Sequence, residues 1–294
     1  MNITYNNRTL RIDCNEIGFS KKNVAALCKI GQSSKSGLDN SRRYIGEKGI
    51  GFKSVFKVAH IVWIHSNHYS FRFDKGRDLG MIAPVWADFP AEVIPGVTSM
   101  VMKLDPECNT TELIREIQSL DSRLLIFLQN LKRINIQVTE EGNYTWKTSL
   151  ERHDEVSGSK SYQLVTLRHG KIRHSYSVFS HKVINLPSEK NRVNITQSQI
   201  LLAFPIQDEQ EARVDPQRVY AFLPIRDYGF KVWSYPEDYY YCRLTPFSSS
   251  CKQTSSSLPV AKILILPLGG IMHCWNKYPM QSTMRLKSLT GTNA

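Results

Sequence analysis

The segment I-G-E-K-G-I-G-F-K-S-V-F, residues 45–56, decides the fold that we expect. It places Gly46, Gly49 and Gly51 in a G-x-x-G-x-G array that leads into an amphipathic run, residues 52–59. Because glycine has no Cβ, a ligand can approach the main chain closely there. The unpaired N–H groups of a helix's first turn and the positive end of its dipole favour phosphate. The segment predicts a phosphate-binding loop followed by a helix.

A second phosphate-binding motif overlaps this array. Residues 46–54 nearly spell the Walker A loop G-x-x-x-x-G-K-S, but Phe52 separates Gly51 from Lys53. That extra residue would turn the lysine away from the β- and γ-phosphates that it must reach. A Walker loop also follows a buried apolar strand, and residues 41–45 are a poor one. We therefore disfavour the Walker interpretation.

The residues upstream of the glycine array strengthen the prediction that it binds phosphate. Residues 10–59 resemble the ATP-binding domain of the GHKL superfamily, which contains gyrase, the ninety-kilodalton heat-shock chaperones, histidine kinases and mismatch-repair ATPases. The chaperone branch has a strand, D-x-G-x-G, a helix, a G-T-x-x-K-S-G-like lid start and G-x-x-G-x-G-F. The counterparts follow in the same order here, at residues 10–12, 14–18, 23–29, 31–37 and 46–52. The string N-E-x-G-F, followed by I-G-E-K-G-I-G-F-K-S-V-F, is similar above all to the sacsin and NO VEIN-like branch.

The resemblance implies an α+β fold, a two-layer α/β sandwich of the Bergerat ATP-binding type. We expect this nucleotide-binding domain at residues 1–135, a β-rich module at 136–235 and a poorly ordered tail at 236–294. Apolar periodicity predicts one helix at 111–132 and strands at 61–65, 69–73, 96–102, 134–138 and 162–167. Residues 200–206 and 219–225 are predicted to be adjacent strands of one sheet.

The tail differs from the rest in composition. After Asp238 the chain contains no acidic residue, and serine-rich patches occur at 248–250 and 255–257. A stretch of this length ordinarily holds several acids. We interpret it as non-homologous coding sequence that gives a poorly ordered tail. The alternative is a basic interaction tail with a short buried strand within residues 258–271.

The resemblance also implies a set of nucleotide-binding residues. Main-chain N–H groups of the glycine array would hold the phosphates, and a lid at residues 31–43 would close over them. Thr98 matches the strand threonine that reaches adenine in the chaperone branch, although threonine is also an ordinary strand former. The candidate contacts are Asn15, Glu16, Gly18, Lys35, Ser36, Gly46, Gly49, Ile50, Gly51, Phe52 and Thr98.

The adenine contact departs from the chaperone pattern. Cys14 stands where that branch has its adenine-binding acid, and a thiol is a weak acceptor. Asp13, Asn15 or Glu16 could serve instead if the strand end is displaced. Sacsin-like relatives carry an asparagine and an acid at this point, which favours Asn15 and Glu16. The alternative is that both are solvated turn residues.

The ligand implied by the resemblance is ATP with Mg²⁺. The family's catalytic glutamate and Mg²⁺-binding asparagine lie on a helix before the first motif. Only M-N-I-T-Y-N-N-R-T, residues 1–9, precedes the first matching strand, and it contains no carboxylate to act as general base. We therefore expect a fold without its first helix, no catalytic or metal-ligating side chain, and nucleotide binding without the usual hydrolysis. Whether the protein is an enzyme is left open.

Composition limits the other function classes. The net charge of +12 is scattered in short pairs without interleaved aromatic residues, which disfavours nucleic acid as a partner. The six cysteines include no C-x-x-C pair, so neither zinc nor a disulfide framework is indicated. Without a signal peptide or a long apolar run, we expect an intracellular protein, cytoplasmic or nuclear, and no membrane partner.

Three functional hypotheses remain from the sequence. The first is a chaperone-like, ATP-dependent module, and the second is a non-catalytic pseudo-ATPase scaffold or a gene fragment. The third is a basic nucleic-acid-binding protein. The β-rich module at 136–235 is a candidate contact surface for other protein domains.

Overall fold

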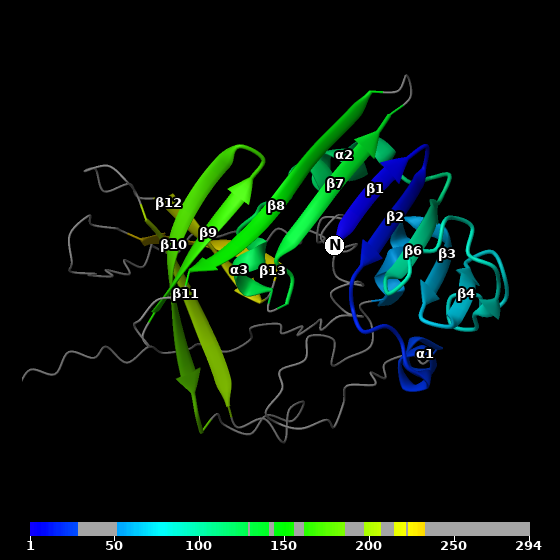
Figure 1. The fold of residues 1–294 in the computed structure, drawn as a ribbon, viewed down its shortest axis with the longest axis horizontal. Helices are drawn as coiled ribbons and strands as arrows, with labels where there is room; N and C mark the ends of the chain where they lie inside the picture. Colours follow the sequence, from blue (N-terminus) through cyan, green and yellow to red (C-terminus); the bar gives the residue numbers. More distant parts are fainter. Residues whose placement is uncertain are drawn as a thin grey trace, which may run out of the picture.

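One large mixed sheet dominates the computed structural model, which describes residues 1–28, 52–128, 130–140, 144–155, 162–185, 197–206, 215–221 and 223–232. Its eleven strands run in the order β11-β10-β9-β8-β7-β1-β2-β6-β3-β4-β5, and β12 and β13 form a separate two-stranded sheet (Figure 1). The strands are β1 Asn2–Asn6, β2 Thr9–Cys14, β3 Ala59–Ser66, β4 Tyr69–Asp74, β5 Val85–Trp86, β6 Thr98–Leu104, β7 Arg133–Thr139, β8 Thr145–Glu155, β9 Tyr162–His169, β10 Ile172–Val183, β11 Ser198–Ile206, β12 Asp215–Ala221 and β13 Leu223–Val232. The helices are α1 Lys21–Cys28, the 3₁₀ helix η1 Phe52–Lys57, α2 Thr110–Gln118 and α3 Leu124–Phe127.

β1 joins the two halves of this sheet. It pairs antiparallel with β2 and parallel with β7. The β1–β2 turn places Asn7 at φ 42° and Arg8 at φ 57°. Two left-handed residues in a two-residue loop match the twist of paired strands. At the start of β1, the Met1 ammonium group donates to the carbonyl oxygen of Arg133, 3.0 Å away.

The hydrophobic core lies on one face of the sheet. Alternate residues of each strand point to that face, so Leu10, Ile12 and Cys14 of β2 are buried together. α2 contributes Leu113 and Ile117 to the same core. The N-terminus of α2 is capped by Asn109, whose side-chain oxygen accepts from the Glu112 N–H at 3.1 Å. Other members of the core include Phe52, Phe56, Ile64, Phe71, Phe73, Met100, Met102, Leu125, Ile134, Leu150, Val165 and Leu167.

The predicted two-layer α/β sandwich is wrong. Many neighbouring strands are joined by tight hairpins, as at Asn67 between β3 and β4 and at Gly170 between β9 and β10. A hairpin needs about two residues, whereas a crossover helix needs a dozen or more, so these connections leave no helical layer. The described helices hold only 8, 6, 9 and 4 residues, too few to cover eleven strands.

Individual elements follow the sequence prediction more closely. The strands predicted at 10–12, 61–65, 69–73, 96–102, 134–138 and 162–167 correspond to β2, β3, β4, β6, β7 and β9, and the helix predicted at 23–29 corresponds to α1. The single helix predicted at 111–132 is wrong, because α2 ends at Gln118 and α3 begins at Leu124. Between them the Asp121 carboxylate accepts from the Arg123 N–H at 2.9 Å, which satisfies that donor outside a helical ladder.

The predicted pairing of residues 200–206 with 219–225 is also wrong. β11 pairs with β10, whereas β12 and β13 pair with each other. The apolar segment 219–225 is divided between the end of β12 and the start of β13, which run antiparallel. The division into domains at residue 135 stays a prediction, and the tail at 236–294 lies outside the described residues. In the described part of the chain, no helix has the length and hydrophobicity needed to cross a membrane.

Candidate functional site

The candidate site begins where β2 ends. Cys14, the last residue of β2, pairs with Thr98, the first residue of β6, so these two positions lie side by side at one end of the sheet. The loop that follows leads into α1 through Ser20, whose main-chain N–H donates to the Asn23 side chain at 2.8 Å. The Asn23 N–H in turn donates to Ser20 Oγ at 3.4 Å, which is a variant of the capping box with asparagine in place of the usual glutamate or glutamine.

A buried hydroxyl pair fixes this loop to the sheet. The Ser66 and Thr98 hydroxyl oxygens lie 2.6 Å apart, and both residues are almost fully buried. The Phe19 N–H donates to Ser66 Oγ at 2.8 Å. Buried polar groups are costly unless they are paired, so this network holds the first motif against β3 and β6.

Gly18 has a structural reason to be glycine. Its φ is +81°, and a Cβ added there would lie 2.3 Å from Asn67 Nδ2. That amide donates to the carbonyl oxygens of Ile17 and Phe19, at 3.3 and 3.2 Å. Because Gly18 has no side chain, the Asn67 amide can lie against it and donate to both of its neighbours in the loop. We call this contact the Asn67 clamp.

The proposed adenine contacts differ in their accessibility. Asn15 is exposed, Glu16 is half-buried and Thr98 is 1% exposed. Burial raises the pKa of the Cys14 thiol to about 11, so this sulfur stays protonated at neutral pH. The structure thus brings Thr98 to the first motif, while the nucleotide roles of Asn15, Glu16, Gly18 and Thr98 stay predictions.

Asp13 lies on the opposite face of the sheet from Cys14 and Thr98. Side chains alternate along a strand, and Asp13 pairs with Ser99 rather than Thr98. Its carboxylate accepts from Arg11 Nε at 2.9 Å and from Ser99 Oγ at 2.6 Å. The carboxylate is engaged on that outer face, so Asp13 is a poor substitute for the missing adenine-binding acid.

The phosphate side of the predicted site is described only from Phe52 onward. Phe52 is buried at the start of η1, and its ring centroid lies 5.1 Å from that of Phe73. The amphipathic run at 52–59 therefore begins as a 3₁₀ helix rather than an α-helix. The remaining predicted residues, Lys35, Ser36, Gly46, Gly49, Ile50 and Gly51, lie outside the described residues.

Lys53 is a feature that sequence reasoning missed, because it was considered only as a Walker lysine. Its Nζ lies 4.6 Å from the Phe73 ring centroid and 5.2 Å from that of Phe52, and it donates to the Met81 carbonyl oxygen. Burial lowers the pKa of Lys53 to about 8. The aromatic contacts favour the ammonium form but do not replace its lost hydration.

Replacing Lys53 with methionine is expected to change how stability depends on pH. The pKa falls from 10.5 to about 8 on folding, so between these values the unfolded chain binds more protons. The native chain should therefore gain free energy of unfolding relative to Lys53→Met as the pH rises across that window. The buried Cys14 thiol, whose pKa is raised from 9.0 to about 11, acts in the opposite direction above pH 9, but it does so equally in both chains. Urea unfolding at several pH values measures this. Lys103→Met, at an exposed position of β6, is the control, and parallel profiles for native and Lys53→Met chains would refute the expectation.

Metal ligands are sparse around this site. Within the described ranges, no group of three or more His, Cys, Asp or Glu side chains could hold a metal ion. Mg²⁺ in nucleotide sites keeps several waters and is bound by one or two carboxylates together with phosphate oxygens.

Comparison with known proteins gives a sequence relative and structural likenesses. The chain is 31% identical over 243 residues to protein NO VEIN of Arabidopsis thaliana, an alignment that covers 74% of this chain and 8% of that protein. A structural match to the 43K ATPase domain of Thermus thermophilus gyrase B, in complex with an aminocoumarin, covers 60% of this chain and 50% of that one. It has a TM-score of 0.27 and 10% identity, too low to support an argument. No protein-family model matches. The chain is thus similar in sequence to a small part of NO VEIN.

Proposed function

We propose that this chain is a nucleotide-binding module of the GHKL type, in the sacsin and NO VEIN-like branch, and that its ligand is ATP with Mg²⁺. The observation that carries the proposal is the pairing of Cys14 with Thr98. The first motif and the strand threonine are far apart in sequence, and the resemblance requires them at one site. The sequence similarity to NO VEIN supports the same proposal.

In this proposal the adenine lies against the end of β2 and β6. The Ser66 hydroxyl accepts from Phe19 and can donate its own proton to Thr98. Thr98 then keeps its proton for a ring nitrogen of the base. Asn15 and Glu16, which follow Cys14, supply polar groups for the exocyclic amine.

The phosphates are proposed to bind at the glycine array. Main-chain N–H groups of Gly49, Ile50, Gly51 and Phe52 hold them, and Lys35 and Ser36 approach from the lid. Lys53, which follows Phe52 directly, adds a cation next to this loop. Mg²⁺ is held chiefly by the phosphate oxygens. The proposed activity is binding that changes the chain's conformation, with slow turnover or none.

The test is thermal unfolding of the full chain with and without Mg-ATP or Mg-ADP. A ligand at 100 times its dissociation constant should stabilise the native state by about 2.7 kcal/mol, which raises the midpoint by several degrees. The shift should be absent from Gly51→Val, because its side chain blocks the close approach of a phosphate. Phosphate release measured on the same samples decides whether the bound nucleotide is hydrolysed.

Gly170→Val is the matched control for this test. Gly170, in the β9–β10 turn, has φ +57°, and the nearest atom to an added Cβ is Thr148 Oγ1 at 3.8 Å, so the substitution strains the backbone away from the proposed nucleotide site. Its nucleotide-dependent shift should match that of the native chain even if its midpoint is lower. Equal shifts in native and Gly51→Val chains, or no shift in either, would refute the proposed site.

A further inference from the structure

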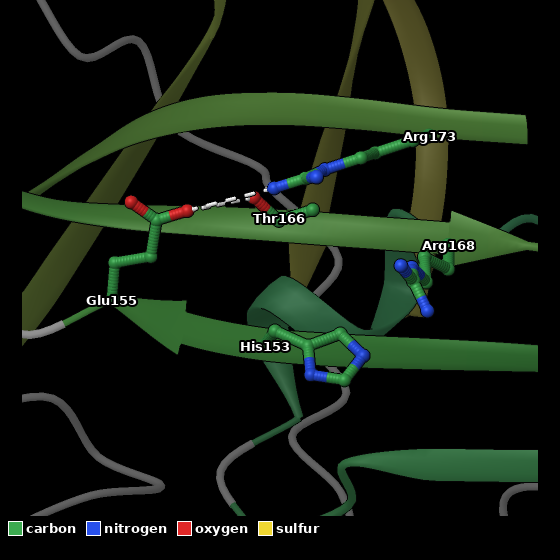
Figure 2. Close-up of a pocket in the computed structure, with 5 residues that line it drawn as sticks. All are labelled: His153, Glu155, Thr166, Arg168 and Arg173. Atoms are coloured by element: carbon green, nitrogen blue, oxygen red, sulfur yellow. Dashed lines mark hydrogen bonds and ion pairs between the residues drawn. The ribbon is translucent and has the colours of Figure 1, made fainter.

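A second charged site lies on the other half of the sheet, on β8, β9 and β10. Figure 2 shows Glu155, Thr166 and Arg173 joined by a hydrogen bond and an ion pair, with His153 and Arg168 beside them. These five side chains line a cavity of about 250 Å³. The strand register explains why they share a face, since Thr166 of β9 is opposite His153 of β8 and Ser175 of β10.

The β9–β10 hairpin concentrates positive charge at this cavity. Its tip reads R-H-G-K-I-R-H, residues 168–174, and contains no acid. Arg168 and Arg173 are directly opposite each other in the antiparallel register. Like charges in directly opposite positions destabilise a strand pair unless an anion lies between them. The hairpin therefore has an unfavourable charge arrangement that a bound anion would relieve.

The neighbouring acids do not neutralise both arginines. Glu151 is opposite Arg168 but is engaged elsewhere: it accepts from Ser149 Oγ at 3.1 Å and lies 3.2 Å from His153 Nε2. Arg133 Nε also lies 3.3 Å from this carboxylate. Among the described residues, Arg168 forms no ion pair.

Glu155 is the acid within the cavity itself. Its carboxylate accepts from Thr166 Oγ1 at 3.2 Å, whereas its distance to Arg173 Nη2 is 3.9 Å. Arg173 and Glu155 are both more than half exposed, and a pair of this kind contributes little to stability. An incoming anion with a higher charge can replace Glu155 as the partner of Arg173.

We propose that this cavity binds a phosphomonoester dianion. Two guanidinium groups offer paired N–H donors that match phosphate oxygens. The Thr166 hydroxyl donates to Glu155 and can donate to the phosphate once the anion displaces that carboxylate, while His153, whose Nε2 lies against Glu151, lines the cavity wall. The cavity is smaller than the roughly 300–1,000 Å³ of sites for whole small molecules, so it suits a phosphoryl group rather than a nucleotide. Glu155 repels any incoming anion, whereas the two guanidinium groups favour the dianion, because the higher charge gains more from each of them than the single charge of a phosphodiester.

The test is calorimetric titration of the full chain with inorganic phosphate, O-phosphoserine and a phosphoserine peptide. Arg168→Gln and Arg173→Gln should each weaken binding by about tenfold, since each removes a charge-assisted contact. Arg115→Gln, at an exposed position of α2, is the charge-matched control and should bind like the native chain. Gly51→Val should also leave this binding unchanged, which separates the cavity from the proposed nucleotide site.

The probes also distinguish the source of the phosphoryl group. Equal affinities for inorganic phosphate and the peptide would identify a site for a free phosphorylated small molecule, and tighter binding of the peptide would identify a phosphoprotein partner. Glu155→Gln should strengthen binding of every phosphomonoester. The proposal fails if a single-stranded oligonucleotide binds more tightly than the phosphomonoesters. It also fails if Arg168→Gln has no greater effect than Arg115→Gln.

Discussion

Phe73→Ala is expected to lower the free energy of unfolding by about 3–5 kcal/mol, because it empties a fully buried aromatic position. The Phe73 ring centroid lies 5.1 Å from Phe52, 6.2 Å from Phe56 and 5.8 Å from Phe71. The substitution therefore removes the contact that fixes η1 on the sheet as well as the aromatic area itself. The loss should also weaken the proposed binding of nucleotide, since η1 follows the glycine array in the sequence.

Urea unfolding measures this effect through the shift of the midpoint at unchanged slope. Trp86→Ala is the aromatic control: Trp86 contacts Phe71 at 6.0 Å but is 71% exposed, so its loss should cost less than about 1 kcal/mol. Comparable losses for the two variants would show that Phe73 does not support the core as described.

Gly18→Val should destabilise the chain by about 3 kcal/mol, through two separate causes. A non-glycine residue at φ +81° is strained by roughly 1–2 kcal/mol. The added Cβ would also displace the Asn67 side chain, which donates to Ile17 and Phe19. Each lost hydrogen bond costs about 1 kcal/mol.

Gly96→Val separates these two causes, because Gly96 has a similar φ of +71° and no atom within 4 Å of an added Cβ. The difference between the two variants, measured by thermal or urea unfolding, gives the contribution of the Asn67 clamp. If both variants lose the same stability, Asn67 contributes nothing and the loop is held by the Ser66 and Thr98 hydroxyls alone.

Local patterns in the sequence predicted most strands but not how they assemble. The segment that forms β7, R-I-N-I-Q-V-T, alternates between buried and more exposed positions, so its type and approximate bounds are visible from the sequence. The N-terminal strand β1 was missed, although Ile3 and Tyr5 have the period of two that a strand requires.

The error in fold class has a physical origin. The resemblance implies a helical layer, whereas described connections such as β1–β2, β3–β4 and β9–β10 are short turns that join antiparallel neighbours and leave no room for a helix. The break between α2 and α3 was hidden by leucines and isoleucines at helical spacing, which continue across Asp121. Apolar spacing does not report the polar side-chain contact that ends a helix.

Only part of the candidate site could be predicted, because some of its contacts depend on how distant segments pair. Motif order indicated that Thr98 belongs with the first motif, and the strand register places it beside Cys14. No sequence pattern indicates Ser66 or Asn67, because their importance arises from hydrogen bonds with main-chain atoms of a distant loop. A charge pair such as Arg168 and Arg173 likewise becomes visible only through the register.

The position of β1 has a consequence for the order of folding. The sheet has one half from β2 to β5 and another from β7 to β11, and each half can form from hairpins and other connections within one part of the sequence. β1, by contrast, pairs with β7 across a separation of 132 residues at the Met1 contact. Contacts of such high sequence separation carry a large loop-closure entropy and form slowly. The two halves should therefore gain structure first, and the insertion of β1 against β7 should be the late step that makes them one cooperative unit.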